Sequence, residues 1–80
     1  MDAAIAFGKV LRRLREAASL TQEQLGFEAD LRRTYVSILE LGQQQPSLTT
    51  ILKIAQALNC TPGKLLDLVL DEISLKNKKR

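Results

Sequence analysis

The sequence predicts an all-α domain of five short helices, and three observations support this fold class. Apolar residues recur every three or four positions in successive segments, which is the spacing of one buried helix face. Residues that cap helix N-termini stand before three of those segments: Thr21, Ser47 and Thr61. The chain is 80 residues long, so these helices have to share one small core.

The composition agrees with one folded domain. Hydrophobic residues make up 45% of the chain, a fraction typical of globular rather than disordered proteins. The formal charge is +3, which permits binding to nucleic acid without establishing it. Basic residues are concentrated near the N-terminus and at the C-terminal end. We expect residues 1–74 to form the domain and residues 75–80 to form a basic flexible tail.

The sequence does not indicate an enzyme, a metalloprotein or a membrane protein. There is no His and only one Cys, Cys60, so the chain lacks the ligands of a zinc site and cannot form an intramolecular disulfide. The single thiol fits a reducing cytoplasm, where we expect the protein to reside. No nucleophile–base constellation is present, and no apolar run is long enough to span a membrane. We therefore expect no catalysis, no cofactor, no metal and no membrane.

The first helix is predicted at residues 2–18. Its buried stripe repeats at i, i+4, i+7 and i+11: Phe7, Leu11, Leu14 and Ala18. Gly8 lies inside this helix, where it is expected to cost about 1 kcal/mol of stability relative to Ala.

Two short helices joined by a tight turn are predicted between Thr21 and Gly42. Thr21 and Gln24 form a capping box, in which each side chain satisfies a backbone N–H at the helix start. The apolar pattern breaks at Asp30, a residue type that enters the left-handed backbone region more readily than most, and it resumes at Leu31. Gly42 favours a left-handed C-terminal cap. This arrangement is the helix-turn-helix pattern.

The fourth and fifth helices complete the predicted fold. The fourth begins after the cap Ser47 and is expected to face the core with five residues: Leu48, Ile51, Leu52, Ala55 and Leu58. Thr61 caps the fifth helix and Pro62 takes its first position, where the missing N–H is no loss. The fifth helix carries apolar residues on more than one side: Leu65, Leu66, Leu68, Val69, Leu70 and Ile73. A chain of this size buries one stripe, so we expect the surplus to be a partner surface.

Three segments stand in a characteristic order and spacing: QEQLG from Gln22, RTYVS from Arg33 and LELG from Leu39. In these segments the chain resembles the lambda-repressor-like (Xre/Cro-type) helix-turn-helix family, and the resemblance covers roughly residues 7–70. It implies a five-helix DNA-binding domain whose recognition helix, at about residues 32–41, lies in the DNA major groove. Restriction–modification controller proteins and small phage-type repressors share this bare single-domain layout.

Four residues at the start of the predicted recognition helix are candidates for base contacts: Arg32, Arg33, Thr34 and Ser37. An arginine here can donate two hydrogen bonds to guanine O6 and N7, and the alternative is that the arginines only neutralise phosphate. Helix geometry puts Arg33 and Ser37 on one face. Thr34 and Ile38 share another, so Ile38 can either contact a thymine methyl group or belong to a protein-binding surface.

Phosphate contacts are expected of six residues: Gln22, Arg12, Arg13, Tyr35, Gln43 and Gln44. In the family that the chain resembles, the glutamine at the position of Gln22 reaches a phosphate. The loop that contains Gln43 lies over the DNA backbone in that family, and an ordinary solvated loop is the alternative. The family also links the positions of Arg15 and Glu40 by a partly buried ion pair, which we expect to fix the recognition helix in its angle.

We expect the chain to be a transcriptional regulator that binds a pseudo-palindromic operator as a homodimer. Its two recognition helices would enter successive major grooves about 34–36 Å apart. The expected dimer interface lies on the fifth helix: Leu65, Leu68, Val69, Glu72 and Ile73. The alternative is an antitoxin-type interaction module of the same fold that binds a toxin. If the regulator activates transcription, RNA polymerase is the further partner that it would contact.

Overall fold

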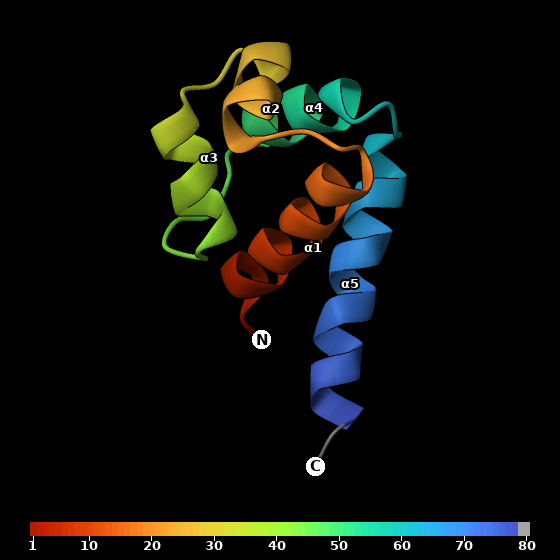
Figure 1. Cartoon of the computed structure of the whole chain (residues 1–80). Helices are drawn as coiled ribbons and strands as arrows, with labels where there is room; N and C mark the ends of the chain where they lie inside the picture. Colours follow the sequence, from red (N-terminus) through yellow and green to blue (C-terminus); the bar gives the residue numbers. More distant parts are fainter. Residues whose placement is uncertain (79–80) are drawn as a thin grey trace.

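The computed structural model contains five α-helices and no strand within residues 1–78, the part of the chain that the structure describes, with side chains described up to residue 75. The helices are α1 Ala3–Ala17, α2 Gln22–Ala29, α3 Arg33–Glu40, α4 Leu48–Ala57 and α5 Pro62–Lys78. Figure 1 shows α3 and α5 on opposite sides of α1, with α2 and α4 across one end of it. The predicted all-α, five-helix fold is confirmed.

The helix-turn-helix follows the local signals in the sequence. Thr21 Oγ1 accepts the backbone N–H of Gln24 at 3.0 Å, and the Gln24 side chain accepts the backbone N–H of Thr21 at 2.9 Å. Asp30 ends α2 in the left-handed conformation, with φ 57° and ψ 49°. Gly42 follows α3 with φ 72°. The predicted capping box, turn and left-handed cap are therefore all present.

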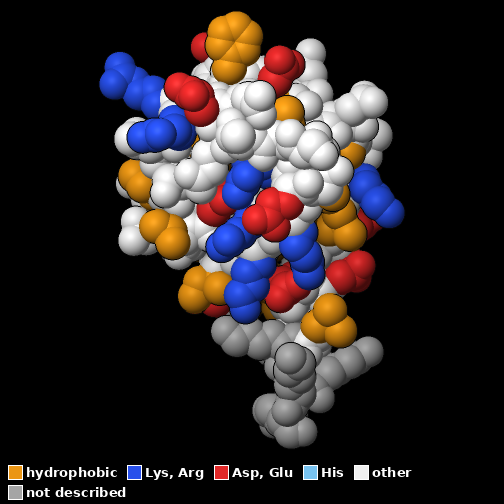
Figure 2. Space-filling view, viewed as in Figure 1, with side chains coloured by type: hydrophobic (Ala, Val, Ile, Leu, Met, Phe, Trp, Pro, Cys, Tyr) orange, Lys and Arg blue, Asp and Glu red, His pale blue; other side chains and the backbone are white. Residues whose placement is uncertain are grey.

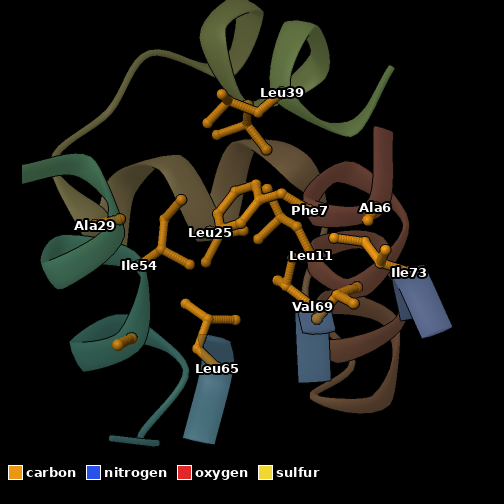
Figure 3. Close-up of a cluster of buried hydrophobic side chains, with 13 residues drawn as sticks. Ala6, Phe7, Leu11, Leu25, Ala29, Leu39, Ile54, Leu65, Val69 and Ile73 are labelled. Carbon is orange, nitrogen blue, oxygen red and sulfur yellow. The ribbon is translucent and has the colours of Figure 1, made fainter. Parts of the chain in front are cut away.

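A single hydrophobic core joins all five helices (Figure 3). Every helix contributes buried members to it: Ala6, Phe7, Val10, Leu11, Leu25, Ala29, Val36, Leu39, Ile54, Ala55, Leu65, Val69 and Ile73. Phe7 and Leu11 of the predicted first stripe are buried, and Leu14 packs against the core. Ala18 is exposed instead, because it caps the C-terminal end of α1 beyond the last turn that packs inward.

The inner face of α4 differs from the predicted one. Leu48 and Leu52 are 71% and 48% exposed, whereas Ile54 is fully buried. Thr50 is also buried, and its Oγ1 lies 3.0 Å from the hydroxyl of the cap residue Ser47. Thr50 and Ile54, one turn apart, therefore define the core side of α4. The prediction for Leu48 and Leu52 is wrong because apolar residues surround most of this helix, and their spacing alone does not select the inner side.

α5 packs against α1 with residues that were expected to contact a second copy. Leu65, Val69 and Ile73 are 0%, 7% and 9% exposed, so they belong to the chain's own core. Their assignment to a dimer interface is wrong, because α1 and α4 need this side of α5 to close the core. Leu68 is half-buried against the same core. The large apolar residues that α5 leaves exposed are Leu66, Leu70 and Leu75.

α5 also extends further than predicted and is joined to α1 by an ion pair. The helix continues to Lys78, so it includes residues 75–78 of the predicted tail, and residues 79–80 lie outside the described residues. Glu72 Oε1 lies 3.0 Å from Nη2 of Arg13, with 15% of the Glu72 side chain exposed. Glu72 thus fastens α5 to α1, and its expected place in a dimer interface stays a prediction.

Gly8 lies where α1 crosses α3. A Cβ atom at this position would be 2.7 Å from the carbonyl oxygen of Glu40 and closer still to that of Leu39. Side-chain carbons do not approach backbone oxygens so closely, and the crossing therefore requires glycine. The close crossing of α1 and α3 thus explains why a glycine lies inside a helix.

Candidate nucleic-acid interface

α3 presents one side to the core and the opposite side to solvent. Val36 and Leu39 are fully buried on the inner side. The residues on the outward side are exposed or half-buried: Arg33, Thr34, Ser37, Ile38 and Leu41. A helix held in this way can place its outward side in the major groove of B-DNA, which is about 12 Å wide, while its inner side stays anchored.

The two arginines expected to contact bases border different parts of the surface. Arg32 precedes α3 as its N-cap residue, with the extended backbone angles φ −71° and ψ 145°. It borders a shallow hollow that Asp30 of the turn also lines. Arg33 is the first residue of α3 and borders a separate hollow with Gln22, at the start of α2. The two arginines therefore border different hollows around the start of α3, and the base contacts expected of them stay predictions.

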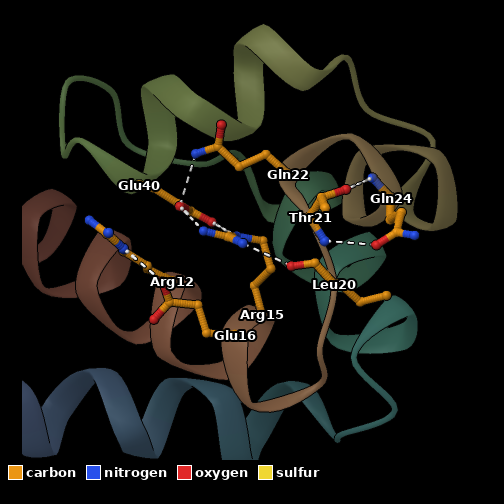
Figure 4. Close-up of polar contacts among 8 residues, drawn as sticks. All are labelled: Arg12, Arg15, Glu16, Leu20, Thr21, Gln22, Gln24 and Glu40. Carbon is orange, nitrogen blue, oxygen red and sulfur yellow. Dashed lines mark hydrogen bonds and ion pairs between the residues drawn. The ribbon is translucent and has the colours of Figure 1, made fainter.

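Glu40, the last residue of α3, joins this helix to α1 and α2 (Figure 4). Its Oε2 accepts the Arg15 Nε–H at 2.6 Å, and its Oε1 accepts an N–H from Arg15 Nη2 at 3.1 Å. The amide nitrogen of Gln22 donates to the same Oε1 at 3.0 Å. Arg15 Nη1 also donates to the backbone carbonyl of Leu20 at 2.8 Å. The ion pair expected between Arg15 and Glu40 is present.

This ion pair is largely shielded from water, since 12% of the Arg15 side chain and 4% of the Glu40 side chain are exposed. Hydrogen bonding to Glu40 raises the pKa of Arg15, desolvation opposes this, and the negative charges of Glu40 and Glu16 raise it further. The guanidinium therefore stays charged. Because either ion would be costly without its partner, the pair fixes α3 relative to α1.

Gln22 occupies the first position of α2, as predicted, but its side chain is committed to Glu40. A carboxylate only accepts hydrogen bonds, so Glu40 requires Gln22 to present its amide nitrogen. The Gln22 oxygen consequently points away from Glu40 (Figure 4). One amide N–H and the backbone N–H groups at the start of α2 remain for an anion. The two residues are 18 positions apart, so no local pattern in the sequence indicates this hydrogen bond, although the family resemblance implies that a glutamine here can bridge to a side chain of the recognition helix.

The two arginines of α1 that are expected to contact phosphate form different ion pairs. Arg12 pairs with Glu16 at 3.3 Å on the surface, where both side chains are more than half exposed. Arg13 pairs with Glu72 of α5 at 3.0 Å while 58% of its side chain stays exposed, so the phosphate contact expected of it stays a prediction. Figure 2 shows basic side chains over α1 interleaved with acidic ones rather than one continuous basic surface.

The remaining phosphate candidates lie on α3 and beyond its C-terminal end. Tyr35 is half-buried and packs against the core. Gln43 and Gln44 are exposed, and the backbone N–H of Gln43 donates to the carbonyl of Ile38 at 3.1 Å. Leu41 was not among the expected site residues, although it is 65% exposed on the outward side. Its i+7 spacing from Thr34 is the signal that places it there.

The described residues give no sign of a metal or membrane site. They contain no group of three or more His, Cys, Asp or Glu side chains placed to hold a metal ion. No helix among them combines the length and the hydropathy needed to cross a membrane. Every buried side-chain nitrogen and oxygen in this part of the chain has a hydrogen-bond partner, so no orphaned polar group marks a ligand site.

Several known proteins are similar to this chain in both sequence and fold. A helix-turn-helix family model matches residues 11–65. The control protein C.BamHI of Bacillus amyloliquefaciens is 45% identical over 64 residues, which cover 79% of this chain and 79% of that protein. The control protein C.MunI of Mycoplasma sp is 40% identical over 65 residues, covering 80% of this chain and 88% of the relative. The crystal structure of the restriction–modification controller protein C.AhdI from Aeromonas hydrophila matches with a TM-score of 0.75 and 47% identity, over 78% of this chain and 94% of that one.

The matched residues include the capping box of α2, the left-handed turn and the whole of α3. The similarity in sequence and in fold therefore covers α2, the turn and the whole of α3, including its outward side. The chain belongs to the helix-turn-helix family, as a DNA-binding transcriptional regulator of the restriction–modification controller type.

Proposed function

We propose that the chain controls transcription as a homodimer that binds a pseudo-palindromic operator, with one α3 in the major groove of each half-site. The observation that supports this most directly is the outward side of α3, held from behind by the Arg15–Glu40 ion pair. The relatives C.BamHI and C.MunI are control proteins, and C.AhdI is a restriction–modification controller. We therefore propose that the operator lies beside the genes of a restriction–modification system, in the cytoplasm of a prokaryote.

Three residues on the outward side of α3 are assigned to base edges: Arg33, Thr34 and Ser37. Arg33 can donate two N–H groups to guanine O6 and N7, and the two hydroxyls can serve either as donors or as acceptors. Arg32 is assigned to a phosphate, because it lies beside the turn rather than on the outward side. Gln22 and the backbone N–H groups around it offer a second phosphate contact at the start of α2.

The two subunits are proposed to meet through the α4–α5 apolar surface, which we define by its exposed and half-buried members: Leu52, Cys60, Pro62, Leu66 and Leu70. Leu52, Cys60 and Pro62 line one shallow hollow where α4 meets α5. Apolar surface gathered in this way is typical of protein–protein contacts. Because α5 and α3 lie on opposite sides of α1, subunits joined through this surface keep both copies of α3 free (Figure 1).

Sedimentation equilibrium tests the proposed dimer. The wild type should be a dimer at micromolar concentration, and Leu70→Glu should be a monomer, since Leu70 is 55% exposed and its replacement leaves the core intact. Phe27→Glu changes a side chain that is 86% exposed on α2 and serves as the matched control, which should remain dimeric. A monomeric wild type, or a Leu70→Glu variant that remains dimeric, contradicts the proposed interface.

Fluorescence anisotropy with duplex DNA tests the proposed activity. Affinity should fall steeply as salt is raised, because binding to phosphates releases counterions. The monomeric Leu70→Glu variant should bind the same duplex more weakly, since it presents one α3 instead of two. Absence of DNA binding at low salt contradicts the proposed function and leaves the antitoxin alternative, which predicts salt-insensitive binding to another protein.

A further inference from the structure

α3 carries a threonine and two aliphatic residues in one row on its outward side. Thr34, Ile38 and Leu41 follow one another at i, i+4 and i+7, so they line one side of the helix. Leu41 is 65% exposed, Thr34 is exposed and Ile38 is half-buried. We name these three residues the outer stripe. Two aliphatic side chains on the side proposed to read DNA call for a physical explanation, because hydrogen-bonding side chains are the usual readers of base edges.

The charge around the outer stripe suits a nucleic acid. Arg33 is the first residue of α3, next to the stripe in the sequence, and Glu40 is the single carboxylate between Arg33 and Pro46. Glu40 is bound to Arg15 and its side chain is 4% exposed, so its negative charge is compensated on the inner side of the helix. An approaching phosphate backbone therefore meets no uncompensated carboxylate along this side of α3 or in the loop that follows it.

Thymine is the base whose edge matches an aliphatic side chain. In the major groove all four bases display hydrogen-bonding groups, and thymine also displays an apolar C5 methyl group. Burial of one such methyl group against an aliphatic side chain strengthens binding by roughly fourfold. At 1.5 Å per residue the outer stripe is about 10.5 Å long, which equals about three base-pair steps. Its length is therefore sufficient to meet more than one base pair.

We propose that Ile38 and Leu41 are specificity-determining residues that contact thymine methyl groups in the operator. This inference rests on the proposed function, since it requires α3 to lie in the major groove. Arg33 then reads a guanine at one end of the helix, and the two aliphatic side chains select thymine toward the other. Each half-site is expected to hold a thymine about two to four base pairs from the guanine that Arg33 contacts.

Uracil-substituted operators test this inference. Wild-type protein is first used to enrich duplexes from a randomised library, and the enriched duplex is then made with each thymidine in turn replaced by deoxyuridine. Uracil keeps the base pairing and the O4 acceptor of thymine and lacks only the methyl group. Affinity measured by fluorescence anisotropy at fixed salt should fall roughly fourfold at one or more of these positions.

Two protein variants identify the side chain that makes the contact. In a double-mutant cycle, Ile38→Ala or Leu41→Ala should bind the thymidine duplex and its deoxyuridine form equally at the contacted position. Leu41 is largely exposed, so Leu41→Ala keeps the fold even if the half-buried Ile38 proves important for stability. Phe27→Ala removes a more exposed apolar side chain from α2 and should retain the full methyl effect.

The possible outcomes separate this inference from the proposed function. Equal binding of every deoxyuridine duplex by the wild type overturns the inference, while DNA binding itself stands. A methyl effect that persists unchanged in both Ile38→Ala and Leu41→Ala also overturns it. Failure of the wild type to enrich or bind any duplex is a distinct result, because it contradicts the proposed function and removes the inference with it.

Discussion

Arg15 and Glu40 are 25 positions apart in the sequence, yet two nitrogen atoms of the guanidinium bind the two oxygen atoms of the carboxylate. Gln22 donates to one of the same oxygen atoms from the start of α2. The end of the helix proposed to read DNA is therefore tied to both helices that support it, and its orientation depends on one nearly buried carboxylate.

Glu40→Gln should lower the free energy of unfolding by about 3–5 kcal/mol, because it leaves the Arg15 charge nearly buried without its counterion. Urea denaturation followed by circular dichroism measures this loss. Glu16→Gln is the matched control, since it removes the partner of the exposed Arg12 and should change stability by less than about 1 kcal/mol. Equal losses in the two variants would show that the burial of the pair has no energetic consequence.

Gly8→Ala should destabilise the protein by about 1–3 kcal/mol, although alanine is the better helix former. The added Cβ would press on the carbonyl oxygen of Glu40, which a rigid helix cannot withdraw. Gly63→Ala in α5 meets nothing within 4 Å and should be neutral or stabilising by up to about 1 kcal/mol. Thermal unfolding of both variants checks the contrast, and a higher melting temperature for Gly8→Ala contradicts the close crossing of α1 and α3.

Arg33→Ala and Arg32→Ala should weaken DNA binding in different ways. Arg33 lies on the outward side of α3, so its loss should cost about 1–3 kcal/mol on the selected operator and relax the preference at one base pair. Arg32 lies beside the turn, so its loss should weaken binding to all sequences alike and reduce the salt slope by about one. Binding to operators with single base changes, at several salt concentrations, separates the two patterns. The reverse pattern contradicts the assignment of the two arginines.

Asp30→Asn should raise DNA affinity without harming the fold. Asparagine tolerates the left-handed conformation of this position, with φ 57°, about as well as aspartate does. The substitution removes a negative charge, paired with Lys53 at 3.6 Å, from the turn that precedes Arg32, and the gain in affinity should shrink as salt screens the charge. Asp30→Ala removes the same charge but should lose about 1–2 kcal/mol of stability, because alanine is strained in this conformation. A gain in affinity that does not depend on salt contradicts this electrostatic explanation.

The sequence predicts most accurately those features that depend on neighbouring residues. The capping box of Thr21 and Gln24, the left-handed turn at Asp30 and the cap at Ser47 each involve contacts within three or four positions. One clear apolar stripe also identified Phe7 and Leu11 as core residues. These contacts depend mainly on neighbouring residues, so local patterns are sufficient to predict them.

The features that the sequence did not predict involve residues far apart in the chain. The side of α5 that faces α1 could not be chosen, because apolar residues occupy several of its sides and only the assembled core selects Leu65 over Leu66. The need for glycine at position 8 arises from the backbone of α3, which the sequence of α1 does not describe. In the candidate site, the ion pair of Arg15 was expected from a family resemblance, whereas the bond of Arg13 to Glu72 had no local signal.

The two sides of α3 divide the tasks of this helix between separate sets of residues. Val36, Leu39 and Glu40 hold the helix in place, while the outward residues contribute little to the core. A lineage can therefore change its target sequence by substitutions at outward positions, with little effect on folding. Related regulators in one cell can diverge in the same way until neither binds the other's operator, while the residues that hold the fold together remain unchanged.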